Sequence, residues 1–97
     1  MTPNEIIVQK LRMLKPELIS RFYVRSIGLF GSVVRDDFSV LNSDIDIVVD
    51  FSRPVGIEFI DLAEFLEKHF EQKIDLVSQK GIKPKYFDLI RQEIVYV

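Results

Sequence analysis

The sequence contains no cysteine and no tryptophan, and its single histidine is His69. The absence of cysteine excludes disulfide bonds, thiolate metal sites and a cysteine nucleophile. With one histidine, a His-rich zinc site is excluded, and a Ser-His-Asp triad remains only if His69 serves in it. The chemistry of this chain therefore has to come from carboxylates, hydroxyls and cationic side chains.

The chain also lacks a long apolar run and a large excess of charge of either sign. No stretch approaches the roughly 20 apolar residues that span a bilayer, and we expect the polar N-terminal segment not to act as a signal peptide. Thirteen Lys and Arg against fifteen Asp and Glu give a net charge of -2, whereas non-specific nucleic-acid binders are usually clearly basic. These features predict a cytoplasmic protein that does not bind membranes or, directly, nucleic acid.

What the chain does contain is enough apolar mass for one small core. Of its 97 residues, 47% are hydrophobic and 29% are charged, which is the range of a soluble globular domain. We expect a single domain over residues 1–97 with a radius of gyration of roughly 12–13 Å.

The apolar periodicity predicts an α/β (α+β) fold, in which a small mixed sheet has helices packed on one side. Thr2 is expected to cap an N-terminal helix that Pro16 divides into two, because proline interrupts helical hydrogen bonding. A short helix is expected from Ser32 to about Asp37. The remaining segments are expected as strands over 25–30, 44–51, 73–78 and 94–97, and as helices over 57–70 and 84–93.

Two carboxylates stand at the start of the clearest predicted strand, residues 44–51. Because side chains alternate along a strand, Asp44 and Asp46 point to the same face with Cα atoms roughly 6.6 Å apart, while Ile45 and Ile47 point into the core. Neighbouring carboxylates repel each other, so a cation between them or a raised pKa is expected. Mg²⁺ binds such carboxylates together with phosphate oxygens. The alternative is an ordinary surface pair.

Asp75 is a third acid within an apolar strand. If its strand pairs beside the strand of Asp44 and Asp46, three carboxylates converge, and such a set is typical of two-metal phosphoryl or nucleotidyl transfer. The alternative is that Asp75 only keeps an edge strand soluble.

A Gly-Ser turn, Gly31 and Ser32, follows the strand over 25–30. Glycine lets a phosphate approach the backbone, and Ser32 is expected to cap the next helix, whose N-terminal N–H groups favour an anion. Arg35 either contributes charge to a phosphate or lies exposed without a role. Gly-Ser alone is also typical of an ordinary strand–turn–helix connection. The joint order of Gly-Ser turn, Asp-x-Asp strand and further Asp strand is far more specific than any one part.

With these motifs the chain resembles the minimal nucleotidyltransferases of the polymerase-β nucleotidyltransferase superfamily, the small partners of HEPN-domain toxins in toxin–antitoxin pairs. The resemblance rests on residues 29–35, 43–49 and 73–77, and it extends to residues 14–18 and to the closing residues 93–97. It therefore covers essentially the whole chain.

The resemblance implies an antitoxin that transfers AMP from ATP to a tyrosine of a HEPN-family RNase toxin and releases pyrophosphate. It implies that Gly31 and Ser32 hold the triphosphate and that Asp44 and Asp46 bind two Mg²⁺ ions. Asp75 would complete the metal site and act as or near the general base. The sequence departs from the family pattern in the loop before Asp44, which is one residue longer than usual, and at Asp36, where the family usually has glycine; both departures bear on loop contacts.

Two other functions remain open at the level of the sequence. The chain could neutralise a toxin by binding alone, or it could transfer a nucleotide to a small molecule or an RNA, although 97 residues are expected to leave no space for a substrate domain. The final strand could expose an edge and support homo-oligomers. Three further features are interpreted as structural: His69 at a helix end, Asp50 at a strand end, and the lysines of a solvated loop, Lys80, Lys83 and Lys85.

Overall fold

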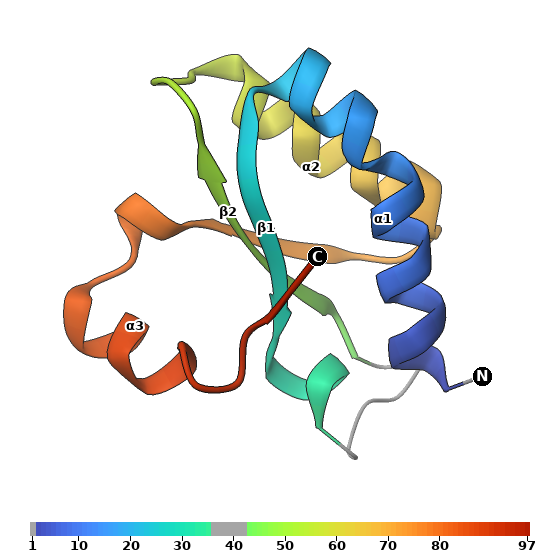
Figure 1. Cartoon of the computed structure of the whole chain (residues 1–97), viewed down its shortest axis with the longest axis vertical. Coiled ribbons are helices and arrows are strands. Elements are labelled where there is room, and N and C mark those ends of the chain that lie inside the picture. The colour runs from blue at the N-terminus through green and yellow to red at the C-terminus, as the bar shows by residue number, and fades with distance from the viewer. Residues whose placement is uncertain (1, 36–42) are drawn as a thin grey trace.

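The computed structural model describes residues 2–35 and 43–97. The longer loop before Asp44, including Asp36 and the end of the predicted helix from Ser32 to Asp37, lies outside the described residues. The elements follow in the order α1 (Pro3–Phe22), β1 (Val24–Phe30), η1 (Gly31–Val34, a 3₁₀ turn), β2 (Ile45–Phe51), α2 (Ile57–Phe70), β3 (Ile74–Ser78), η2 (Gln79–Gly81, a 3₁₀ turn), α3 (Pro84–Ile90) and β4 (Val95–Tyr96) (Figure 1).

The N-terminal segment forms one continuous helix, so the prediction that Pro16 divides it is wrong. The predicted cap is confirmed, since the Thr2 hydroxyl accepts a hydrogen bond from the Glu5 N–H at 3.2 Å. Proline removes one hydrogen bond from the helix interior. Leu11 and Leu18, on the two sides of Pro16, are both completely buried. Packing of both halves against the same core therefore keeps α1 in one piece.

The four strands form one mixed sheet in the order β3-β2-β1-β4. β1 pairs with β2 and with β4 in antiparallel fashion, whereas β2 and β3 are parallel. A parallel pair needs a crossover connection, and α2 provides it. The sheet expected from the sequence is confirmed, with strand ends that differ by one residue.

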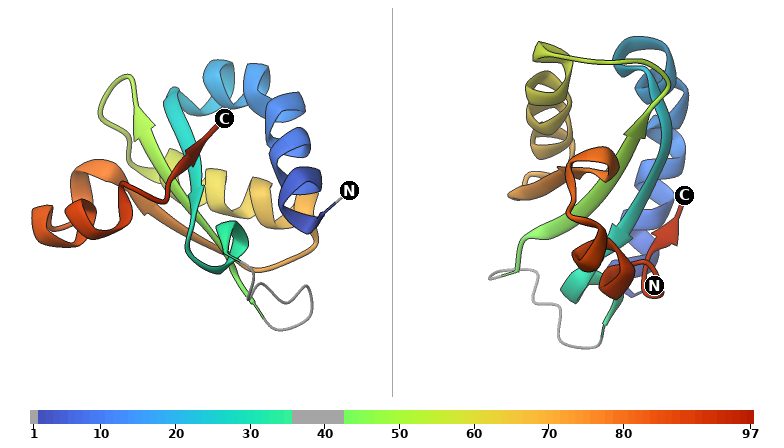
Figure 2. Two further views of the ribbon diagram at one scale, coloured as in Figure 1. Left: turned by 60° about the horizontal axis from the view of Figure 1, so that its bottom comes forward. Right: turned by 90° about the vertical axis from the view of Figure 1, so that its left-hand side faces the viewer.

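The helices cover both faces of the sheet. α1 and α2 bury one face, where Ile45 and Ile47 of β2 contribute to the larger core. α3 packs through Ile90 on the opposite face, against Phe30 and Val48. Figures 1 and 2 show α1 and α2 on one side of the strands and α3 on the other. The prediction that all helices pack on one side of the sheet is therefore wrong for α3. The second face of β2 carries the apolar side chain of Val48, which also has to be covered.

The C-terminal strand β4 is short and is held by contacts with β1 and α1. The Val97 N–H donates to the Ile27 carbonyl at 2.9 Å, and Lys15 Nζ donates to the Val97 carbonyl at 2.7 Å. The radius of gyration is 12.7 Å, within the expected range. Within the two described segments, no helix combines the length and hydropathy that crossing a membrane requires.

Candidate active site

Two of the predicted acids meet on neighbouring strands. In the parallel pairing of β2 and β3, Asp46 lies directly opposite Asp75, and paired strands are separated by about 4.8 Å. Asp46 is half-buried and Asp75 is exposed. The structure thus brings these two carboxylates together, which was expected from the sequence only if their two strands pair.

The third predicted acid, Asp44, lies just before β2 and forms an ion pair with Lys73. Its carboxylate is 3.9 Å from the ammonium group of Lys73. Across residues 2–35 and 43–97 no group of three His, Asp or Glu side chains is arranged to hold a metal ion. Two of the three predicted ligands therefore converge here, and Asp44 acts on Asp46 only through its charge.

Burial and neighbouring carboxylates both raise the pKa of Asp46. Burial raises the pKa of Asp46 to about 6, with further contributions from the charge of Asp75, a hydrogen bond with Asp75 and the charge of Asp44, while Arg35 opposes them. A divalent cation would relieve this repulsion, and carboxylate oxygens are the donors that Mg²⁺ prefers. The residues present at Asp46 and Asp75 therefore suit Mg²⁺ chemically.

Gly31 lies against Asp46, and its conformation explains why glycine stands there. Its φ angle of +74° is in the left-handed region, and an added Cβ would lie 2.1 Å from Asp46 Oδ2. A side chain at position 31 would thus be strained and would push Asp46 away. Close packing of the backbone at position 31 on Asp46 requires this glycine.

Ser32 does not cap a helix, so that prediction is wrong. The turn η1 begins at Gly31, its preceding residue is Phe30, and no side chain caps it. Ser32 lies inside this single 3₁₀ turn, where its carbonyl accepts the Arg35 N–H at 3.0 Å. A turn of four residues offers too few aligned peptides for a helix-dipole anion site. The Ser32 hydroxyl remains a candidate phosphate ligand.

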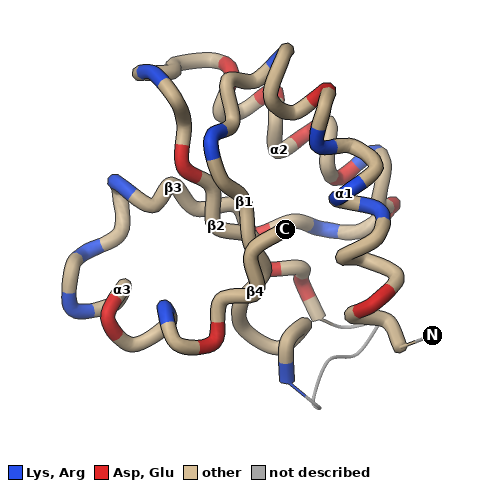
Figure 3. Tube along the Cα trace, viewed as in Figure 1, with Lys and Arg blue, Asp and Glu red and all other residues tan. Residues whose placement is uncertain are grey.

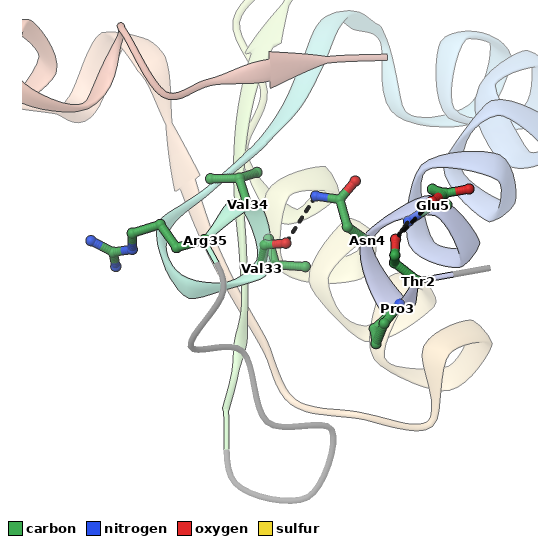
Figure 4. Close-up of a pocket in the computed structure, with 7 residues that line it drawn as sticks. All are labelled: Thr2, Pro3, Asn4, Glu5, Val33, Val34 and Arg35. Carbon is green, nitrogen blue, oxygen red and sulfur yellow. Dashed lines mark hydrogen bonds between the residues drawn. The ribbon is translucent and has the colours of Figure 1, made fainter.

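The position of η1 is set partly by α1. Asn4 Nδ2 donates to the Val33 carbonyl at 2.9 Å, and the Val33 side chain is buried in the core. A hollow of about 490 Å³ lies between the first turn of α1 and η1. Figure 4 shows Arg35 extending away from Asn4, and Arg35 also lines the cavity at Asp46.

A cavity of about 360 Å³ brings Gly31 and the paired carboxylates together with the C-terminal part of the chain. Among the described residues, ten line it: Phe30, Gly31, Arg35, Asp46, Asp75, Val77, Tyr86, Leu89, Ile90 and Glu93. The contributions of Tyr86, Leu89 and Glu93 were not predicted from the sequence. No local pattern indicates them, because they reach the cavity only through the packing of α3 on the sheet.

The features interpreted as structural lie away from this cavity. The His69 ring packs on Phe65 with ring centroids 4.4 Å apart, and Asp50 lies 3.8 Å from Arg25. The predicted lysine cluster is exposed along η2 and the start of α3, the segment with blue positions at the left of Figure 3. None of its members is among the described residues that line the cavity: Lys80, Lys83 and Lys85.

Comparison with known proteins shows which family this chain is similar to. Residues 11–96 match the family model of the nucleotidyltransferase domain. The protein adenylyltransferase MntA of Thermococcus cleftensis is 43% identical over 84 residues, which are 86% of this chain and 84% of that protein.

Solved structures share the architecture at lower sequence identity. A structure described as a minimal nucleotidyltransferase superposes with a TM-score of 0.78 at 24% identity, covering 98% of this chain and 95% of the other. A chain from the complex of a tri-AMPylated Shewanella oneidensis HEPN toxin with its MNT antitoxin gives a TM-score of 0.60 at 23% identity, covering 97% and 67%. These likenesses confirm the fold class expected from the sequence.

Proposed function

Because this chain belongs to the family of nucleotidyltransferase domains, we propose that it is a Mg²⁺-dependent protein adenylyltransferase of the cytoplasm. It transfers AMP from ATP to a tyrosine of a HEPN-family RNase toxin and so acts as the antitoxin. The observation that carries this proposal is the pair Asp46 and Asp75 in one cavity, with Asp46 packed against the side-chain-free Gly31.

The choice of acceptor is supported by what the relatives are called. The relative from Thermococcus cleftensis is named a protein adenylyltransferase, and a chain with the same fold comes from a complex of an AMPylated HEPN toxin with an MNT antitoxin. Adenylyl transfer to a protein partner is consistent with a cavity that opens beside the exposed side chains of Tyr86 and Leu89.

Asp46 and Asp75 would hold Mg²⁺, and Asp44 would join them after leaving Lys73. When bound, the metal neutralises charge on the α-phosphate and on the leaving pyrophosphate. Two ions are proposed, since the phosphates of ATP bring further oxygen ligands to the carboxylates.

The chain's own groups hold the nucleotide and move the proton. The Gly31 N–H and the Ser32 hydroxyl would donate to phosphate oxygens, and Arg35 would add positive charge. The tyrosine oxygen forms a bond to the α-phosphorus while the bond to the pyrophosphate breaks. A tyrosine hydroxyl has a pKa of about 10, so its proton needs an acceptor. Asp75 is exposed at the cavity, and its carboxylate would accept this proton.

The test is adenylylation of a purified HEPN toxin with ATP and Mg²⁺, followed by intact-mass spectrometry. The native chain should add AMP units to the toxin. Asp46→Asn and Asp75→Asn should lower the rate by about 10²–10⁴-fold, whereas Asp61→Asn on the exposed face of α2 should leave it unchanged. A stable complex whose toxin gains no AMP would instead identify a binding-only antitoxin.

A further inference from the structure

One acid in the cavity has no part in the proposed chemistry. Glu93 Oε1 accepts a hydrogen bond from the Gly31 N–H at 3.0 Å, across 62 positions of sequence. Glu93 is half-buried and lines the same cavity as Asp46 and Asp75. A side-chain carboxylate thus occupies the backbone donor that the nucleotide's phosphates are proposed to use.

The segment between α3 and β4 fixes the position of Glu93. Glu93 stands between α3 and β4, and its own N–H donates to the Ile90 carbonyl at 2.9 Å. The following residues lie close on β1 at Gly28, where an added Cβ would be 2.7 Å from Ile94 Cγ2. Because Gly28 has no side chain, β4 can approach β1 closely and hold Glu93 beside Gly31.

The charges of the cavity make this contact unfavourable for a bound triphosphate. Among the described residues that line it, three are acids, Asp46, Asp75 and Glu93, and one is a cation, Arg35. Mg²⁺ can offset the two aspartates, which are its proposed ligands. Glu93 would remain as an anion on the Gly31 N–H, and a phosphate oxygen cannot bind there while the carboxylate does.

We propose that Glu93 is an affinity-determining residue that competes with the phosphates of the nucleotide for the Gly31 N–H. The inference rests on the proposed function, because it takes Gly31 as part of the phosphate site. Nucleotide binding displaces the Glu93 side chain, and part of the binding free energy is used for that exchange. Removing the negative charge at position 93 consequently strengthens binding of the triphosphate without touching the nucleoside.

The experiment is calorimetric titration of the full chain, in Mg²⁺ and without an acceptor, with ATP, inorganic triphosphate and adenosine. Glu93→Gln should bind ATP and triphosphate about fivefold more tightly than the native chain, the scale of one partly exposed charge interaction. Glu93→Ala should do the same, and adenosine affinity should not change. Glu64→Gln makes the same change of charge on the exposed face of α2 and serves as the control.

The possible results separate the inference from the function on which it rests. Weaker triphosphate binding by Glu93→Ala with native affinity in Glu93→Gln would mean that the side chain only positions the turn, and this would overturn the inference. Equal affinity in the native chain and both variants would overturn it as well, while leaving the proposed function standing. If no chain, native included, bound ATP or triphosphate, both would fall. Thermal melts of each variant establish that it is folded.

Discussion

At the scale of single residues, the position of the Asp46 side chain depends on the absence of a side chain at Gly31. The left-handed backbone at Gly31 turns the chain so that Asp46 Oδ2 would be 2.1 Å from any Cβ at that position. Asp46 in turn is directly opposite Asp75, so a displacement at Gly31 reaches the carboxylate pair. Glycine and aspartate here form one packed unit and not two independent motifs.

Replacing Gly31 by alanine should therefore damage both stability and activity. The strained backbone and the contact with Asp46 predict a loss of about 1–3 kcal/mol in the free energy of unfolding, measured by urea denaturation, together with loss of AMP transfer. Gly56→Ala is the matched control, since an added Cβ there meets nothing within 4 Å. Equal stability of the two variants would contradict this account of Gly31.

Asp46 gives the metal-free chain a specific pH dependence. Its folded pKa of about 6 is above the ordinary value of 3.8, so its contribution to stability is complete below pH 3.8 and is lost as the pH rises through about 6. Asp46→Asn removes this loss. In buffer with a chelator, the melting temperature of the Asp46→Asn variant minus that of the native chain should therefore be larger at pH 7.5 than at pH 4.5. A constant difference across that range would show that neither burial nor the neighbouring carboxylates raise the pKa of Asp46.

At the scale of elements, α1 shows how packing overrides a local break. Pro16 lies in the interior of a helix of 20 residues, where the missing N–H costs up to about 3 kcal/mol. The helix nonetheless continues, because Leu11 before it and Leu18 after it are buried in the same core. Pro16 therefore lowers the local stability of the helix, and the tertiary contacts of Leu11 and Leu18 offset this loss.

Pro16→Ala should consequently stabilise the chain. Restoring the hydrogen bond should raise the free energy of unfolding by about 1–2 kcal/mol, less than the full cost because alanine also gives the unfolded chain more freedom. Urea denaturation measures the change, and Ser20→Ala, also exposed on α1, is the control. A destabilised Pro16→Ala variant would mean that the shape imposed by proline is needed for packing.

At the scale of the whole molecule, the candidate active-site cavity exists only where five parts of the described chain meet. Its lining comes from the end of β1, the turn at Gly31, β2, β3, and the stretch from α3 to Glu93. α3 can contribute because it covers the second face of the sheet, opposite α1 and α2 (Figure 1). Ligand binding should therefore stabilise the entire fold and not one element alone.

Mg²⁺ and ATP together should raise the melting temperature of the native chain. At a ligand concentration of about 100 times Kd, the gain in unfolding free energy is about 2.7 kcal/mol. The gain should be smaller at pH 5 than at pH 7.5, because a metal binds the ionised carboxylate and Asp46 is protonated below its pKa of about 6. Differential scanning fluorimetry measures it. An equal gain in Asp75→Asn would argue against that carboxylate as a ligand.

Much of the fold could be read from local patterns in the sequence. The alternation over residues 44–51 predicted β2 and the core-facing side of Ile45 and Ile47, and helical periodicity predicted α2 over 57–70 with the observed bounds. The same alternation predicted that Asp46 would face away from that core. Patterns with periods of two and 3.6 residues depend only on near neighbours, so they survive in the sequence.

The sequence by itself therefore determined most of the elements and the mixed sheet, whereas the approach of Asp46 to Asp75 was expected only if their two strands pair, as the structure has them. Only the tertiary structure decided that α1 stays whole through Pro16, that α3 covers the second face, that Asp44 lies beside Lys73, and that Glu93 reaches Gly31. The physical reason is distance along the chain. A side chain's neighbours within one element follow from backbone geometry, whereas contacts between remote segments depend on how completed elements pack.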